Sequence, residues 1–142
     1  MMFLRRIALL LVLGALIIAP GCTGMLKGKE ASTKAIAEFH KLYNDGRIAE
    51  IYAASDPKFK KASDEKQFSD LMGALQKKLG KVTATKEAGF NINTFNLTTS
   101  VVLNQETTFE QGKGTEVFTF EMNGDKAVLV GYQINSNDLI VK

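Results

Sequence analysis

The spacing of apolar residues changes at Gly80, and this change constrains the fold more than any other feature of the chain. Before Gly80, apolar residues recur three or four positions apart, as they do on one face of an α-helix. After Gly80 they alternate with polar residues, and threonine, valine, phenylalanine and asparagine dominate, as in half-buried β-strands. Helices followed by strands predict an α+β domain.

Three helices are predicted before Gly80. The first lies within residues 30–46 and ends at the polar sequence Asn44-Asp45-Gly46. The second is short, over residues 47–55, and the Ser55-Asp56-Pro57 sequence after it indicates a turn or a new helical start. The third lies within residues 63–80, with Ser63 or Asp64 as its N-cap and lysines in its last turn.

Four strands are predicted after Gly80, over residues 81–91, 98–109, 115–122 and 126–135. Short glycine-containing turns separate the later strands, which favours antiparallel pairing of neighbours. The amphipathic helices are then expected to cover one face of a four-stranded sheet. A chain of 142 residues is long enough for one such domain and too short for two ordinary ones.

The amino-terminal segment has the three-part layout of a secretory signal. Arg5 and Arg6 come first, an apolar run over residues 7–18 follows, and the small residues before Cys22 complete it. As a helix, the apolar run would span roughly 18 Å, well short of the ~30 Å hydrocarbon core of a bilayer. Cleavage with lipidation, ordinary cleavage with secretion, and an uncleaved anchor are the three alternatives.

This segment resembles a bacterial lipoprotein precursor. Gly21 and Cys22 match the family's cleavage motif, whereas Ala19 and Pro20 depart from it. The resemblance implies cleavage before Cys22, diacylglycerol on its thiol and an acyl chain such as palmitate on its amine. Thr23 at the next position implies delivery to the outer membrane, facing the periplasm. We therefore expect a signal peptide over residues 1–21, a lipidated tether over 22–29 and one domain over 30–142.

The rest of the chain resembles a group of uncharacterised bacterial envelope lipoproteins with a cystatin-like, or nuclear-transport-factor-2-like, cone fold. The stretches that carry this resemblance are AEFHKLYNDGRIAEIYAASDPKFKK, FSDLMGALQKKLGKV and TTFEQGKGTEVFTFEMNGDKAVLVGYQINSN. The resemblance implies helices against a strongly curved antiparallel sheet, sometimes with a pocket at the wide end. It implies no activity.

Few residues point to catalysis, metals or cofactors. His40 is the only histidine, at the edge of an apolar helical face; it is either a boundary residue or a general base without a patterned nucleophile. One histidine and one cysteine do not make an ordinary zinc site, and no acidic cluster has calcium-loop spacing. The glycines of the EQGKG and NGDK sequences join strands, so we expect no phosphate site and no cofactor.

The net charge and the aromatic residues limit which classes of partner molecule the protein is expected to bind. Two of the 18 basic residues precede the apolar run and 15 residues are acidic, so the remaining chain is close to neutral and nucleic acid is not expected as a partner. Aromatic residues either fill the interior or line a pocket for an apolar ligand; the candidates are Phe39, Tyr43, Phe68, Phe118, Phe120 and Tyr132.

Three functions remain open on the sequence. The leading one is a non-enzymatic module, held at the membrane through Cys22, that binds an envelope protein or a small ligand. The second is a cone specialised for a lipid or another apolar molecule. The third is an enzyme that uses His40.

Overall fold

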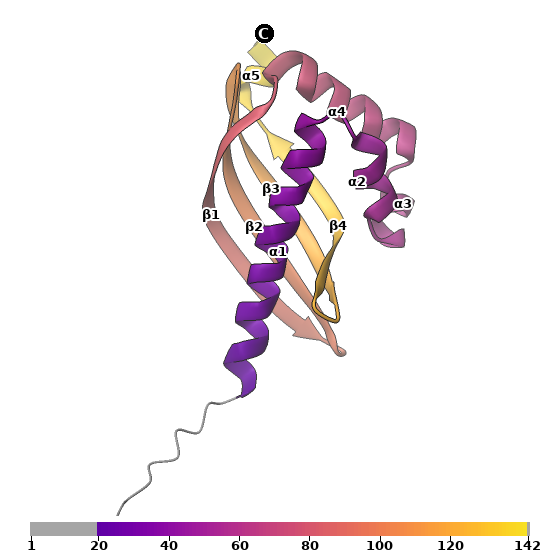
Figure 1. Ribbon diagram of the computed structural model, residues 1–142, viewed down its shortest axis with the longest axis vertical. Helices are drawn as coiled ribbons and strands as arrows, with labels where there is room; N and C mark the ends of the chain where they lie inside the picture. The colour runs from indigo at the N-terminus through magenta and orange to yellow at the C-terminus, as the bar shows by residue number, and fades with distance from the viewer. Residues whose placement is uncertain (1–19, 142) are drawn as a thin grey trace, which may run out of the picture.

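The computed structural model of the protein describes residues 20–141, in which helices precede a four-stranded antiparallel sheet (Figure 1). The predicted signal peptide lies almost entirely outside these residues, and so does the side chain of Cys22. The predicted α+β class is confirmed. The elements are α1 (Pro20–Asn44), α2 (Ile48–Ala54), α3 (Pro57–Ala62), α4 (Glu65–Leu79), β1 (Val82–Phe95), β2 (Thr98–Phe109), β3 (Gly112–Asn123), β4 (Lys126–Asn135) and α5 (Asn137–Val141).

Helix α1 is longer than the sequence predicted, because it begins at Pro20 and includes the segment assigned to the tether. Gly28 and Ser32 are buried on the same helical stripe as Ile36, one turn apart. Their small side chains let the helix approach the sheet, where a Cβ added at Gly28 would lie 3.5 Å from Val101 Cγ2. The end of the predicted tether is therefore packed against the domain.

Helices α3 and α4 begin at the polar residues that the sequence suggested. At α3, Asp56 accepts a hydrogen bond from the Lys58 amide at 2.8 Å, and Pro57 occupies the first helical position. At α4, Asp64 rather than Ser63 is the N-cap, and it exchanges hydrogen bonds with Gln67 in a capping box. Helix α4 ends at Gly80, whose φ of +77° is the left-handed conformation that glycine adopts without strain.

The sheet is a meander in which each strand pairs with the next, in the order β1-β2-β3-β4. Two strands are longer than predicted: β1 continues to Phe95, and β3 begins at Gly112, inside the expected EQGKG turn. Residues 110–111 and 124–125 form the turns after β2 and β3. The short helix α5 was not predicted.

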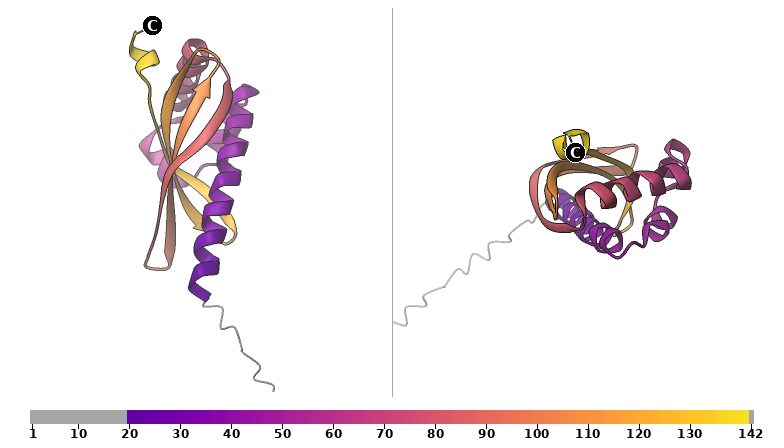
Figure 2. Two further views of the ribbon diagram at one scale, coloured as in Figure 1. Left: turned by 90° about the vertical axis from the view of Figure 1, so that its left-hand side faces the viewer. Right: turned by 90° about the horizontal axis from the view of Figure 1, so that it is seen from above.

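The sheet curves around α1, which lies along its concave face (Figure 2). Helices α2, α3 and α4 stand beside α1 toward β4, whereas α5 lies on the opposite, convex side (Figures 1 and 2). Within residues 20–141, none of the helices is both long and apolar enough to cross a membrane.

Candidate functional site

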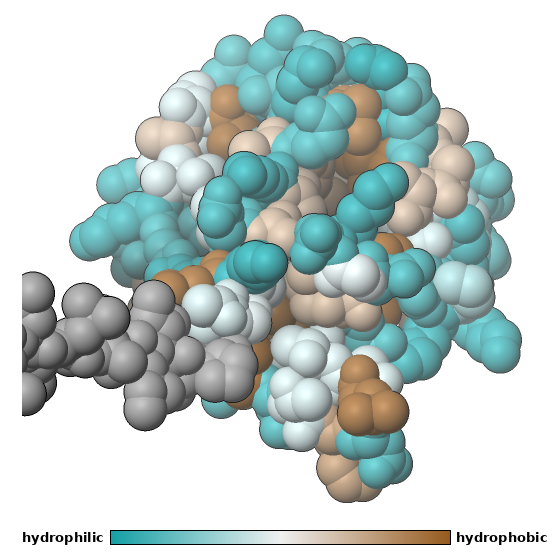
Figure 3. Space-filling view, turned by 60° about the horizontal axis from the view of Figure 1, so that its bottom comes forward, coloured by the Kyte–Doolittle hydropathy of each residue, from teal (hydrophilic) through white to brown (hydrophobic). Residues whose placement is uncertain are grey.

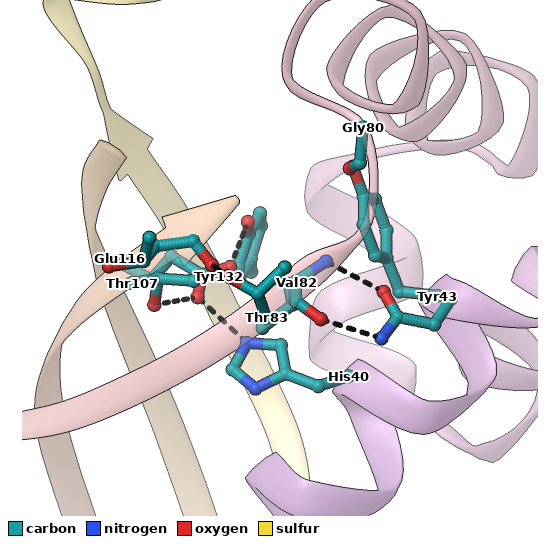
Figure 4. A network of polar contacts seen from close by, with 10 residues as sticks. His40, Tyr43, Gly80, Val82, Thr83, Thr107, Glu116 and Tyr132 are labelled. Carbon is teal, nitrogen blue, oxygen red and sulfur yellow. Dashed lines mark hydrogen bonds and ion pairs between the residues drawn. The ribbon is translucent and has the colours of Figure 1, made fainter. Parts of the chain in front are cut away.

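Four polar side chains meet in the interior between α1 and the sheet: His40, Thr107, Glu116 and Tyr132 (Figure 4). We call them the Glu116 network, because each of the others bonds to that carboxylate. They come from α1, β2, β3 and β4, so the network joins the helix to three strands.

The strand register explains why these side chains converge. Glu116 on β3 lies opposite Gln105 on β2 and Ile134 on β4. Side chains two residues away on a neighbouring strand share the same face and lie diagonally across. Thr107 and Tyr132 occupy those diagonal positions on either side of Glu116.

Glu116 accepts a hydrogen bond from each of the three other members. Nε2 of His40 and Oγ1 of Thr107 bond to Oε2 at 2.7 Å and 2.5 Å, and the Tyr132 hydroxyl bonds to Oε1 at 2.6 Å. Only 1% of Glu116 is exposed to solvent. Burial of a carboxylate is costly without such partners, and three donors compensate for the lost hydration.

The contact with Glu116 indicates which ring nitrogen of His40 acts as the donor. An ionised carboxylate only accepts, so Nε2 donates, and a neutral imidazole would leave Nδ1 as an acceptor. Among the residues that the structure describes, Nδ1 has no hydrogen-bond partner.

Burial raises the pKa of the Tyr132 hydroxyl well above its usual value, and the charge and hydrogen bond of Glu116 raise it further. Burial, with smaller effects from Glu116 and Glu110, also raises the pKa of Tyr43, whose hydroxyl donates to the Gly80 carbonyl at 3.0 Å. Both phenols are therefore neutral donors at physiological pH. Figure 4 shows Tyr43 beside the network, at the point where α1 meets the start of β1.

Aromatic rings enclose the network. The Phe118 ring lies edge-on to His40, with 5.7 Å between ring centroids, and Phe39 stacks on Tyr132 at 5.0 Å. Phe39 also meets Phe118 edge-on at 5.1 Å. These apolar rings limit the access of water to the network and so strengthen the polar contacts inside it.

Three of the hollows on the described part of the chain adjoin this core. A groove of about 560 Å³ lies among the ends of the strands near α5, on the side away from the start of α1, and Thr107 is one of its lining residues. A hollow of about 340 Å³ lies between α3, α4 and the sheet, with Phe68 and Tyr132 in its wall. A smaller one of about 190 Å³ lies between α1, α2 and the sheet.

The six aromatic candidates contribute mainly to the core. Phe68 and Tyr132 line the 340 Å³ hollow, and Phe39 and Phe120 line the 190 Å³ hollow. All except the partly exposed Tyr132 are at least 95% buried, and each packs against other rings. Whether one of these walls holds an apolar ligand stays a prediction.

His40 is not a boundary residue, because only 7% of it is exposed and its ring is held between Glu116 and Phe118. An imidazole backed by a carboxylate is part of the usual acid–base arrangement, but such a base also needs a neighbouring place for a reacting atom. His40 lines none of the three hollows described above. This geometry suits a structural link better than a general base.

Sequence reasoning missed Glu116 and Thr107. One signal was present: in TEVFTFEM, Glu116 falls in the same alternating phase as Phe118, Phe120 and Met122, so an acidic residue stands on the apolar face of a strand. A charge at such a position requires a buried partner. In residues 20–141, no group of histidine, cysteine or acidic side chains is arranged to hold a metal ion.

Comparison of the chain with known protein families, with characterised proteins and with solved structures found no match.

Proposed function

We propose that the protein is a lipid-anchored component of the bacterial cell envelope, attached through Cys22 to the outer membrane and facing the periplasm. Its domain binds a partner molecule rather than catalysing a reaction. We assign the domain to the cystatin-like cones of envelope lipoproteins, and the helix along the concave face of a curved antiparallel sheet supports this assignment (Figure 2).

The observation that carries the proposal is the position of Cys22 in the first turn of α1, three small residues after the apolar run of the sequence. The buried Gly28 is six positions after Cys22, which is roughly 9 Å along a helix. Acyl chains on Cys22 would hold the domain close to the bilayer. Such chains contribute about 0.8 kcal/mol per buried methylene, so several of them make a stable anchor.

The polar groove supports a binding role. The groove lies at the end of the sheet that is far from the start of α1. Helix α1 has 25 residues and is therefore roughly 37 Å long, so the groove is distant from Cys22. In the anchored protein this groove would face away from the membrane. Lys86, Lys113 and Glu106 line it together with threonines, which suits a polar ligand or a polar segment of another protein.

Intact-mass analysis of the protein extracted from membranes tests the anchor. We expect an amino terminus at Cys22 that carries acyl chains, and we expect Cys22→Ser to abolish the modification. Thr23→Ala, at the next position, is the matched control and should keep the acyl chains. An unmodified soluble form that begins at another residue would overturn the proposal.

Site-specific photo-cross-linking in the native envelope tests the groove. A cross-linking residue at the exposed Thr115, in the groove, should give a discrete adduct. The same residue at the exposed Asn91, further along the convex face, is the control and should not. Equal labelling from both positions would argue against a binding site in the groove.

A second candidate function is the binding of a small apolar molecule, and the 340 Å³ hollow with its aromatic wall favours it. A fluorescent fatty-acid probe should then bind saturably to the purified protein. Leu71→Glu, in the wall of the hollow, should weaken binding, whereas Ile140→Glu, at an exposed isoleucine on α5, should not. Native mass spectrometry without a bound apolar species, combined with no saturable binding, would exclude this candidate.

A further inference from the structure

Large apolar side chains are exposed at the end of the molecule where α1 begins. Met25 and Leu26 on α1 are 52% and 67% exposed, and Phe95 and Leu97 at the β1–β2 turn are 73% and 100% exposed. Figure 1 places this turn and the start of α1 at the same end of the domain. We call these four residues the apolar end; Figure 3 views this end and shows apolar surface on a projecting part of it.

Leu97 occupies an unfavourable backbone conformation. The two-residue turn places Asn96 at φ +47° and Leu97 at φ +64°, both in the left-handed region. Hairpin turns of this kind usually carry glycine at the second position, because a bulky side chain with positive φ is strained. Since Leu97 is fully exposed, no packing within the domain offsets that strain.

The hairpin that carries Leu97 is also free of charge. From Ala88 to Gln105 there is no acidic or basic residue, although 23% of the chain is charged. Asparagine and threonine supply the exposed polar groups of this segment. An uncharged hairpin can enter a lipid headgroup region without removing a charge from water, which would be costly.

The occupant that fits this surface is the bilayer that holds the anchor. The apolar run of the sequence leads into α1 at this same end, and Met25 is only three residues from Cys22. A lipid anchor at Cys22 would keep the apolar end beside the boundary between headgroups and acyl chains. Leucine and phenylalanine are the side chains with which peripheral proteins enter that boundary.

We propose that Phe95 and Leu97, together with Met25 and Leu26, insert into the membrane to which Cys22 is attached. The inference rests on the proposed function. The domain then contacts the bilayer at two places, the start of α1 and the β1–β2 turn, and this pair of contacts fixes its orientation. The polar groove at the other end is presented to the periplasm.

A single introduced tryptophan tests the insertion, because the sequence contains none. The full acylated chain with Leu97→Trp is reconstituted into phosphatidylethanolamine and phosphatidylglycerol vesicles, with and without brominated acyl chains. We expect emission at shorter wavelength than in water and loss of most of the intensity with brominated lipid. Phe95→Trp is a second probe of the same turn. The control is Ile140→Trp on α5, at the opposite end of the domain, where the native Ile140 is 80% exposed. This variant should show neither the shift nor the quenching.

The outcomes separate this inference from the proposed function. Intact mass on the same samples reports acylation, and a chain without acyl groups overturns the proposed function whatever the fluorescence. An acylated Leu97→Trp chain whose tryptophan emits as in water overturns only the insertion. A shift to shorter wavelength without quenching by brominated lipid means that a protein, such as a second copy of this chain, covers the turn. That result also overturns the proposed insertion into the membrane. Equal quenching at positions 97 and 140 refutes the fixed orientation.

Discussion

Replacement of Glu116 by leucine would measure what the Glu116 network contributes to stability. Leucine has a similar volume but no acceptor, so the variant leaves the hydroxyl or ring N–H donors of His40, Thr107 and Tyr132 without their partner. Each buried donor that loses its partner costs about 1–3 kcal/mol. Thr107 is 1% exposed, whereas His40 and Tyr132 keep slight access to water, so the lower part of that range applies to them.

We therefore expect Glu116→Leu to lower the free energy of unfolding by about 3–6 kcal/mol, a large share of the roughly 5–15 kcal/mol typical of a folded domain. Glu116→Gln should cost only about 1–2 kcal/mol. Its amide oxygen still accepts from His40 and Thr107, and its amide nitrogen can donate to the Tyr132 oxygen.

The assay is urea unfolding of the acylated protein in detergent, followed by far-ultraviolet circular dichroism, with an unchanged slope against urea as the test of two-state behaviour. Glu106→Leu, at an exposed position on the convex face of β2, is the control and should change stability by less than about 0.5 kcal/mol. A loss of under about 1 kcal/mol for Glu116→Leu would refute the view that the network links α1 to the sheet.

The remaining predictions concern single side chains and backbone positions. Because the pKa of Tyr132 is raised in the folded state, the contribution of Tyr132 to stability is complete below about pH 10 and is lost as the pH rises further. Tyr132→Phe should therefore make the free energy of unfolding less sensitive to pH above about 10. Part of the pH dependence should remain, because the pKa of Tyr43 is raised as well. Ser32→Ala should stabilise the protein by about 1 kcal/mol in urea unfolding, because the Ser32 hydroxyl is fully buried and has no hydrogen-bond partner in residues 20–141. Its matched control is Ser55→Ala, which should instead cost about 1 kcal/mol, because Ser55 donates to the Ile51 carbonyl at 2.8 Å. Gly80→Ala should lower the thermal midpoint, at a cost of about 1–3 kcal/mol, because φ is +77° and an added Cβ would clash with the Glu110 side chain. Leu97→Gly should raise the thermal midpoint, by about 0.5–1 kcal/mol of added stability, since relief of the positive φ exceeds the entropy cost of glycine.

Local patterns in the sequence were sufficient to place most elements of the fold. Each of the signals used is local, because it involves residues only a few positions apart. These signals are the change of period at Gly80, the capping residues of α3 and α4, and the alternation in the strands. The start of α1 escaped prediction because Gly28 and Ser32 are buried for their small size, not for their hydrophobicity. A pattern of apolar residues does not detect that kind of contact.

The site was harder to predict than the fold, because its contacts are distant in sequence. His40 and Glu116 are 76 residues apart, and their hydrogen bond depends on where α1 crosses the sheet. The phase of Glu116 among the phenylalanines of β3 predicts a buried carboxylate, but not which donors it meets. The aromatic candidates were chosen from residue type alone, which does not distinguish a packed interior from a lined hollow.

Glu116 and Leu97 are the two clearest exceptions to local rules in this chain, and they differ in how the exception is compensated. A carboxylate on the core face of a strand is unfavourable by itself, yet three donors from the same chain surround Glu116. A leucine with positive φ is also unfavourable, and nothing in the domain covers its side chain. Because natural sequences usually agree with their fold at every level, an uncompensated exception points to a contact outside the domain. We therefore interpret Glu116 as a residue that stabilises the domain internally, and Leu97 as a residue that contacts a partner outside the domain.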